Sequence, residues 1–410
     1  MMQIIYLLII FLSVSGLQGC NGNKPEQARD KKGTAMAARQ ADLQEPVKPA
    51  WIKPDTTGME PELSAIGFSR LMGIGWNLGN SLESISYKNG VYSGDETSWD
   101  NPATTKQLID SVKKAGFTAV RIPVAYSHML DNQVDYKIKW AWKKRVEEVV
   151  NYVLDNDMYA IINIHWDGGW MNDPFYARQA AVNAKIDSLW KQIAIYFRDY
   201  DDHLLFAGTN EIHIEGNYNP PSPENIVVQN SFNQTFVNTV RATGGRNAWR
   251  FLVVQGYVTN IDYTRNYMVI PADPAHDRLM AEVHYYDPWE FCLKEDAPYA
   301  AVWSDASWGK EDWVNTAFGY MKTTFIEKGI PVILGEYGVI YRPSLSGQAL
   351  ADHIASRNYY LNYVTRKALE NGMVPFYWDN GYPDSFGLFN RKDGTRVRKD
   401  AISAIISAGK

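Results

Sequence analysis

The chain has 410 residues, of which 41 are Lys or Arg and 46 are Asp or Glu, giving a formal net charge of −5. Because the two signs are interspersed, the chain offers no basic patch, and we expect no nucleic-acid partner. With 14 Trp and 25 Tyr, it is rich in flat side chains that can stack on the apolar face of a ligand.

The N-terminal segment QIIYLLIIFLSVSGLQGC contains about a dozen apolar residues, which is shorter than a membrane span and fits a signal peptide. Its last four residues, Leu17 to Cys20, resemble the bacterial lipobox, in which cleavage precedes a cysteine that then carries lipid. We expect a signal peptide over 1–19, a lipidated Cys20 and an exported bacterial lipoprotein anchored to a membrane; a secreted chain without lipid is the alternative. The other cysteine is Cys292, so lipidation of Cys20 excludes an intrachain disulfide.

Residues 20–60 combine charged residues, Ala, Gln and Pro with few large apolar side chains, a composition that cannot bury enough surface to fold. We expect this stretch to be a flexible tether. No second change of composition follows, and no internal repeat is present, so residues 61–410 are expected to form a single domain.

Eight short runs in that domain are continuously apolar, which is typical of strands in a parallel sheet covered on both faces. They lie at 71–79, 118–124, 159–166, 204–211, 251–257, 279–287, 331–338 and 374–381. Helical patterns occupy most of the gaps. Strands that alternate with helices in this way predict a (β/α)8 TIM barrel, with a doubly wound open sheet as the alternative.

Two helices have clear start signals. Asn101 with Pro102 predicts a helix that ends at Gly116, and Ser222 with Pro223 predicts the start of another. The glycine-rich segment GIGWNLGN is not a GxGxxG motif, and no P-loop is present, so a nucleotide cofactor is not expected.

Polar side chains gather where the expected strands end, and in such a barrel the chemistry belongs at those ends. They are Asn77, Asn80, Arg121, His165, Asp167, Asn210, Glu211, His284, Tyr286, Glu336 and Trp378. Glu211 and Glu336 are the most informative, because each ends an apolar run, where a charge must be solvated in an open site or paired with partners.

Other chemistries fit these residues less well. His165, Asp167 and His284 could bind a metal ion, but they lack HxH, HExxH or cysteine-pair spacing, so we expect neither a metal nor a cofactor. No GxSxG motif is present, and no Ser or Cys ends these strands, which argues against a serine or cysteine hydrolase. A pair of carboxylates flanked by Asn, Arg, His, Tyr and Trp is typical of glycoside hydrolysis.

The ordered segments GIGWNLGN, RIPV, INIHWDGGW, GTNE, EVHYYD, ILGEYG and FYWDNG resemble those of glycoside hydrolase family 5 over roughly residues 65–390. That resemblance implies a (β/α)8 catalytic domain and a retaining mechanism, and the WNLGN opening resembles the cellulase-like members. It also implies that Glu211 is the general acid/base and Glu336 the nucleophile. Arg121 and Tyr286 would stabilise the charged form of Glu336, and Glu211 would keep its proton longer.

The resemblance implies roles for the remaining residues as well. Asn210 would bind the 2-hydroxyl of the sugar, His165 and His284 would bind hydroxyls or orient Glu211, and Trp378 would stack on the ring. Asn80 is assigned to a neighbouring sugar. The chain departs from many cellulase-like relatives in two places, since Trp166 replaces a second His after strand 3 and Glu83 replaces an Asp.

These observations predict an exported, membrane-anchored endo-β-1,4-glucanase that hydrolyses a β-glucan polysaccharide without a cofactor. Cellulose-like chains, mixed-linkage β-glucan and xyloglucan are all compatible substrates. An endo-β-1,4-mannanase is one alternative, because mannose differs from glucose only at C2. A surface glycan-binding lipoprotein without catalysis is another, although it would predict a broken Asn-Glu pair, and here the pair is intact.

Overall fold

The computed structural model describes residues 45–294 and 300–410. Its strands are β1 (Gly75–Leu78), β2 (Ser86–Lys88), β3 (Val91–Ser93), β4 (Ala119–Ile122), β5 (Tyr159–Asn163), β6 (Leu204–Ala207), β7 (Leu252–Gln255), β8 (Leu279–Tyr285), β9 (Val332–Tyr337) and β10 (Met373–Asp379). Its α-helices are α2 (Ala65–Met72), α3 (Lys106–Ala115), α4 (Trp140–Leu154), α5 (Tyr176–Tyr196), α6 (Pro223–Arg241), α7 (Ile261–Tyr267), α8 (Trp289–Cys292), α9 (Glu311–Thr324), α10 (Gly347–Glu370) and α11 (Lys399–Ser407).

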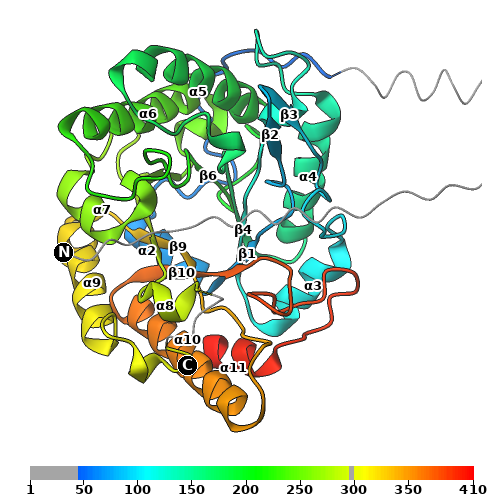
Figure 1. The fold of residues 1–410 in the computed structure, drawn as a ribbon. Coiled ribbons are helices and arrows are strands. Elements are labelled where there is room, and N and C mark those ends of the chain that lie inside the picture. The colour runs from blue at the N-terminus through cyan, green and yellow to red at the C-terminus, as the bar shows by residue number, and fades with distance from the viewer. Residues whose placement is uncertain (1–44, 295–299) are drawn as a thin grey trace, which may run out of the picture.

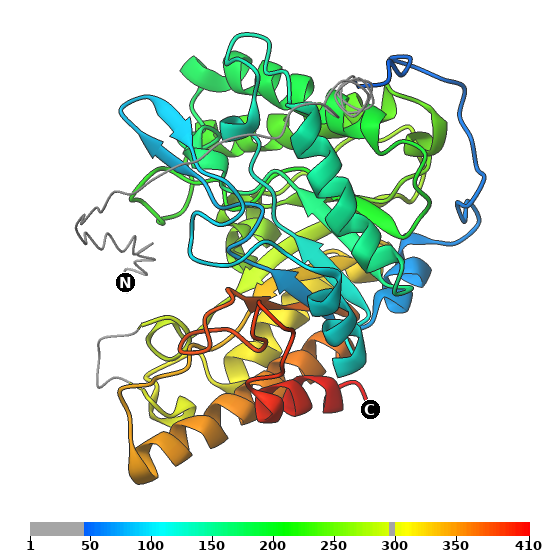
Figure 2. The same cartoon turned by 90° about the vertical axis from the view of Figure 1, so that its right-hand side faces the viewer.

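Eight parallel strands close into a barrel in the order β1-β10-β9-β8-β7-β6-β5-β4, with helices around the outside (Figure 1). Seven of the eight apolar runs contain one of these strands, and the run at 374–381 overlaps β10, which begins one residue earlier. The expected (β/α)8 barrel is therefore confirmed, and the open sheet is excluded. The short antiparallel pair β2-β3 is an insertion after β1, and it projects from the barrel in Figure 2.

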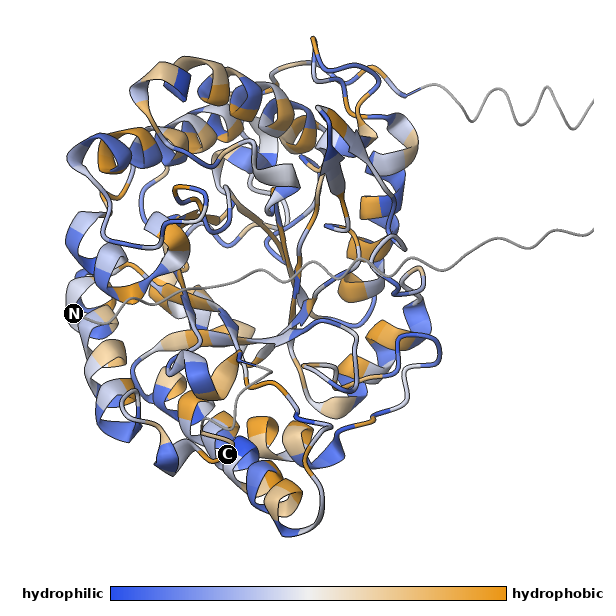
Figure 3. Cartoon of the chain, viewed as in Figure 1, coloured by the Kyte–Doolittle hydropathy of each residue, from blue (hydrophilic) through white to orange (hydrophobic). Residues whose placement is uncertain are grey.

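The strands hold their positions because both of their faces are covered. Outside the barrel, the helices turn hydrophobic faces inward and hydrophilic faces to solvent (Figure 3). At the amino ends of the strands, α2 covers the barrel, and its Phe68 stacks on Phe251 with ring centroids 4.0 Å apart. The carboxyl ends of the strands are left for polar side chains.

The helix start expected at Ser222 is confirmed, since the Ser222 hydroxyl accepts a hydrogen bond from the Asn225 backbone N–H, and Pro223 follows. The start expected at Asn101 is wrong, because Thr105 caps α3 and the helix begins four residues later. The Asn101 side chain instead donates to the backbone oxygens of Asn80 and Asn380, both at 2.9 Å. It therefore joins the loops after β1 and β10.

Residues 20–60 were expected to be a flexible tether, but residues 45–60, the part that the structure describes, contact the barrel. Residues 45–60 run along the barrel: Lys48 Nζ donates to Asp199 at 2.8 Å, Ile52 forms a parallel bridge with Gly244, and Met59 is buried. Composition did not reveal these contacts because polar groups make most of them. The signal peptide and Cys20 lie outside the described residues.

No helix within residues 45–294 and 300–410 has both the length and the apolar character that crossing a membrane requires.

The contacts of residues 45–60 predict a stability difference between two truncations. The reference is a protein that begins at residue 45. A protein that begins at residue 61 should unfold about 2 to 5 °C lower, because it loses the Lys48 ion pair and the cover over apolar surface. Calorimetry of the two proteins would measure this, and equal temperatures would show that residues 45–60 contribute nothing to stability.

Candidate active site

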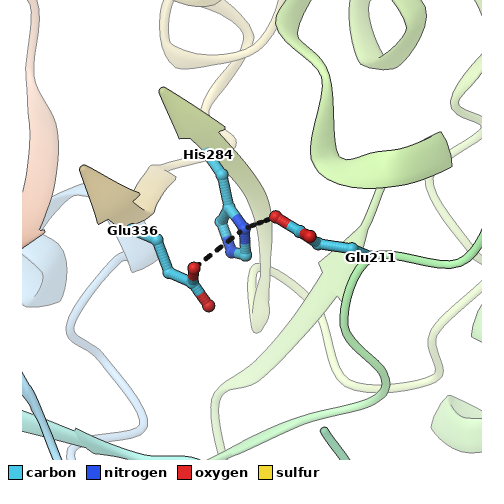
Figure 4. Close-up of side chains that lie close together, drawn as sticks. All are labelled: Glu211, His284 and Glu336. Carbon is cyan, nitrogen blue, oxygen red and sulfur yellow. Dashed lines mark hydrogen bonds and ion pairs between the residues drawn. The ribbon is translucent and has the colours of Figure 1, made fainter. Parts of the chain in front are cut away.

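Glu211 and Glu336 face each other at the carboxyl ends of their strands. Glu211 lies four residues beyond the end of β6, and Glu336 lies in β9. One carboxylate oxygen of each residue and a ring nitrogen of His284 lie within 4.8 Å of one another, with His284 between the two glutamates (Figure 4). Two glutamates that are 125 positions apart in the sequence therefore lie side by side in one small site.

Glu336 is the more enclosed of the two, with a side chain that is only 8% exposed. Arg121 Nη1 donates to Glu336 Oε1 at 3.1 Å, and the Tyr286 hydroxyl donates to Oε2 at 3.0 Å. Burial raises the pKa of Glu336, and the nearby positive charges of His284 and Arg121 offset this only in part. Burial and the Glu336 charge hold the pKa of Tyr286 well above its ordinary value, so Tyr286 remains a donor.

Glu211 is more open, with 36% of its side chain exposed. His284 Nδ1 lies 2.6 Å from Glu211 Oε1. Burial raises the pKa of Glu211, but the hydrogen bond and the charge of His284 outweigh it, and the pKa falls below its ordinary value. The pKa of Glu211 is thus lowered and that of Glu336 is raised, whereas Glu211 was expected to keep its proton longer.

The reason for that difference is His284, whose charge the sequence did not reveal. Burial alone would lower its pKa, but Glu336, Glu211 and Glu282 surround the ring and raise the pKa to about 9. The raised pKa of His284 and the lowered pKa of Glu211 both favour a proton on the ring at the 2.6 Å contact between the two groups. An acid that receives its proton through a hydrogen bond does not need a raised pKa of its own.

Glu282 is the residue of this site that sequence reasoning missed. It lies in β8, is fully buried, and contacts both Arg121 and His284. The available signal was its position inside the apolar run LMAEVHYYD, two residues before His284, because alternate residues of a strand point to the same side.

The structure brings Asn210, His165 and Trp378 to the same end of the barrel. Arg121 Nη2 donates to Asn210 Oδ1 at 2.8 Å. The His165 ring lies parallel to the Trp378 ring, with an interplanar angle of 7° and centroids 5.9 Å apart. Burial, followed by the charges of Arg121 and His284, keeps the pKa of His165 well below its ordinary value, so the ring is neutral.

Asn80 lies in the loop after β1, where its φ of 55° is left-handed. Glu83 accepts hydrogen bonds from the backbone N–H groups of Asn80 and Ser81 and so fixes this turn. The longer Glu83 that replaces an Asp therefore has a structural role here. Trp166 lies on the turn that follows β5, and its indole approaches Gly169.

The carboxylates and His284 are close enough to suggest a metal site. However, His284 Nδ1 and Glu211 Oε1 are 2.6 Å apart, which is a direct hydrogen bond between the two groups that would have to bind the ion. Asp167 is engaged elsewhere, since it accepts from the backbone N–H groups of Tyr126 and Ser127 and from Trp170 Nε1. These contacts favour a proton-transfer site.

Comparison with known proteins agrees with this geometry. The cellulase model of glycosyl hydrolase family 5 matches residues 85–384. This chain belongs to family 5. It is therefore a glycoside hydrolase, and the endoglucanases and xyloglucanases below are its relatives.

Two curated relatives illustrate the similarity of this family 5 chain to known enzymes. A xyloglucan-specific endo-beta-1,4-glucanase of Bacteroides ovatus is 45% identical over 370 residues, which are 88% of this chain and 73% of the relative. Endoglucanase A of Paenibacillus barcinonensis is 37% identical over 372 residues, or 84% of this chain and 90% of the relative.

Solved structures support the same family. A Bacteroides ovatus xyloglucanase in complex with a XXXG heptasaccharide has a TM-score of 0.85 at 43% identity, covering 89% of this chain and 80% of that one. A family 5 xyloglucanase from Paenibacillus pabuli has a TM-score of 0.77 at 38% identity, covering 84% of this chain and all of that one.

The contact between Tyr286 and Glu336 predicts a pH effect. In Tyr286→Phe, Glu336 loses a donor that stabilises its charged form, so its pKa rises and the acidic limb of the pH profile moves to higher pH. We expect kcat to fall about 10- to 100-fold, the range for a hydrogen bond to a charged group.

Tyr337→Phe is the matched control, because the Tyr337 hydroxyl bonds to Thr365 of α10 at 2.6 Å and not to the glutamates. Its pH profile should equal that of the unaltered enzyme. If Tyr286→Phe also leaves the acidic limb in place, Tyr286 does not stabilise the Glu336 anion.

Proposed function

We propose that this family 5 enzyme is a retaining endo-β-1,4-glucanase with xyloglucan as its preferred polymer, Glu336 as nucleophile and Glu211 as general acid/base. The separation of the two carboxylates carries this proposal. Their nearest oxygens lie within 4.8 Å, close to the ~5 to 5.5 Å between carboxyl groups in retaining enzymes and well below the ~6.5 to 9.5 Å in inverting ones. Too little room remains for a water molecule and a sugar ring between them.

In the first step, a Glu336 oxygen attacks the anomeric carbon, and the glycosidic bond to the leaving sugar breaks. Glu211 protonates the leaving oxygen with a proton that it takes from His284 across the 2.6 Å hydrogen bond, so the step ends with Glu211 as a carboxylate and His284 neutral. Arg121 and Tyr286 hold Glu336 in its charged, attacking form. The product of this step is a glycosyl ester of Glu336.

In the second step, Glu211 accepts a proton from water, and the water oxygen attacks the anomeric carbon from the side that the leaving sugar vacated. The ester bond breaks, Glu336 is released as a carboxylate, and the sugar keeps its original configuration. The 36% exposure of Glu211 supports this role, since the same oxygen must meet both a leaving sugar and an incoming water.

Substrate binding is proposed for the residues around the pair. Because Arg121 occupies Asn210 Oδ1, the Asn210 Nδ2 group is the one that can donate to the oxygen of the sugar 2-hydroxyl. Trp378, supported by the parallel His165 ring, offers a flat face for the sugar. Asn80 is proposed to contact the next sugar along the chain.

The preference for xyloglucan rests on the relatives. The Bacteroides ovatus and Paenibacillus pabuli enzymes are both described as xyloglucanases, and the first is 45% identical to this chain. Cellulose-like chains and mixed-linkage β-glucan share the β-1,4-linked backbone and remain slower substrates in this proposal.

The proposal is tested by measuring reducing ends released from xyloglucan, mixed-linkage β-glucan, carboxymethyl cellulose and glucomannan by the protein that begins after Cys20. Xyloglucan should be cut fastest, and Glu336→Gln should lose at least about 10⁴-fold in kcat, because the amide cannot form the ester. Proton NMR of the first product should show the β-anomer.

Other results would point elsewhere. An α-anomer as first product would exclude the retaining mechanism. Hydrolysis of glucomannan without the glucans would favour the mannanase alternative, and inactivity on all four polymers would favour the glycan-binding alternative.

We also propose that the protein is exported and anchored to a membrane by lipid on Cys20, which the lipobox-like residues before it support. When cells are fed an alkyne-bearing fatty acid, the unaltered protein should be labelled and should sediment with membranes. Cys20→Ser should lose both properties, whereas Cys292→Ser, a buried cysteine in α8, should keep them. Labelling that survives Cys20→Ser would contradict the proposal.

A further inference from the structure

The carboxylate of Glu282 lies inside the barrel beneath the two proposed catalytic glutamates. Its side chain is 0% exposed. Its Oε1 atom forms an ion pair with Arg121 Nε at 2.9 Å and lies 3.2 Å from His284 Nε2. One oxygen atom thus contacts both of the cations of the site.

Arg121 contacts Glu336, and His284 contacts both glutamates, since its Nδ1 also lies 3.6 Å from Glu336 Oε2. Arg121 donates to Glu336 at 3.1 Å through Nη1, and His284 lies 2.6 Å from Glu211 through Nδ1. Glu282 contacts the opposite side of each cation, namely Arg121 Nε and His284 Nε2. A movement of Glu282 would therefore shift both partners of the catalytic pair together.

The other oxygen of Glu282 is fixed as well. Gln255 Nε2 donates to Glu282 Oε2 at 2.6 Å, and Gln255 Oε1 accepts from the backbone N–H and the hydroxyl of Thr209. Thr209 lies two residues before Glu211. The network that starts at Glu282 therefore also reaches the chain segment that carries the acid/base.

The neighbouring strand leaves just enough room for this carboxylate. A Cβ atom added at Gly335 in β9 would lie 2.1 Å from Glu282 Oε1, an impossible approach. Gly335 directly precedes Glu336. The glycine next to the nucleophile is thus explained by the place that Glu282 occupies.

We propose that Glu282 is a positioning residue of the hydrolytic reaction, whose carboxylate orients Arg121 and His284 and keeps His284 charged. This inference rests on the proposed function of Glu211 and Glu336. Glu282 touches neither the substrate nor the reacting atoms, and it acts through its two cationic neighbours.

The charge of Glu282 persists at working pH. Burial would raise its pKa, but Arg121 and His284 lower it to about 2. The titratable and charged groups that face His284 come from five elements or their ends. They are Glu282 of β8, Tyr286 directly after β8, Glu336 of β9, Arg121 of β4, His165 after β5 and Glu211 after β6.

The test compares the pH profiles of kcat and kcat/KM on xyloglucan for the unaltered enzyme and for Glu282→Gln. The amide keeps the size of the side chain and removes its charge, so His284 loses its proton at lower pH. We expect the basic limb to move down by about one pH unit. We expect kcat to fall about 10- to 100-fold with KM within about twofold, since small displacements of catalytic groups cost rates of that order.

Asp273→Asn is the matched control, because it also removes the charge of a buried carboxylate that pairs with an arginine. Asp273 and Arg241 are each 5% exposed and form an ion pair at 2.8 Å, and neither contacts the glutamates. This variant should lower the unfolding temperature and leave both limbs of the pH profile in place. If Glu282→Gln behaves in the same way, its role is structural and the proposal is overturned.

Glu282→Asp covers the case in which Glu282→Gln does not fold. It keeps the charge but withdraws the carboxylate by one methylene, so kcat should fall at least about fivefold with the basic limb closer to that of the unaltered enzyme. An unchanged kcat would overturn the proposal.

Histidine ring NMR separates failure of this inference from failure of the proposed function. With the His284 signal assigned from His284→Asn, its pKa should be near 9 and should fall by about one unit in Glu282→Gln. If the unaltered protein cuts no polymer, the proposed function fails whatever the NMR shows. If it cuts xyloglucan and neither the His284 pKa nor the basic limb moves, only the role of Glu282 fails.

Discussion

The charge balance inside the barrel is the constraint on which the active site depends. Three carboxylates, Glu211, Glu282 and Glu336, lie around two cations, Arg121 and His284, where burial penalises every unpaired charge. Removal of any one of these five side chains would leave another buried charge without its partner. The low dielectric that makes such a cluster costly also strengthens each contact, so the reacting groups are held in place before a substrate arrives.

The barrel provides this arrangement through the direction of its strands. Parallel strands bring their carboxyl ends to one side. Alternate positions along β8 and the residue directly after it place Glu282, His284 and Tyr286 on a common line from the interior to the site. The deepest of them binds the cations, the middle one carries the proton, and the outermost donates to Glu336. From the interior outward, Glu282 thus supports the cations, His284 stores the proton and Tyr286 stabilises the Glu336 anion.

The sequence was sufficient to predict the barrel and the meeting of Glu211 and Glu336 at one end of it, because continuous apolar runs and polar strand ends are local patterns. It was insufficient where distant residues decide the outcome. Asn101 resembles a helix cap but bonds to two loops from opposite ends of the chain. Glu282 was hidden in an apolar run, since its partners come from other strands. The pKa shifts of Glu211 and Glu336 run in directions opposite to the expected order of protonation because they depend on the charge of His284.

The arm at residues 45–60 has a mechanical consequence. It joins the barrel at Gly244, which precedes β7, and at Asp202, which precedes β6, so it lies at the end of the strands opposite the glutamates. A pulling force on the chain upstream would pass into the helices and loops at that end and would not load the strand ends that hold Glu211 and Glu336. A force on the chain upstream of residue 45 would thus leave the geometry of the two glutamates unchanged.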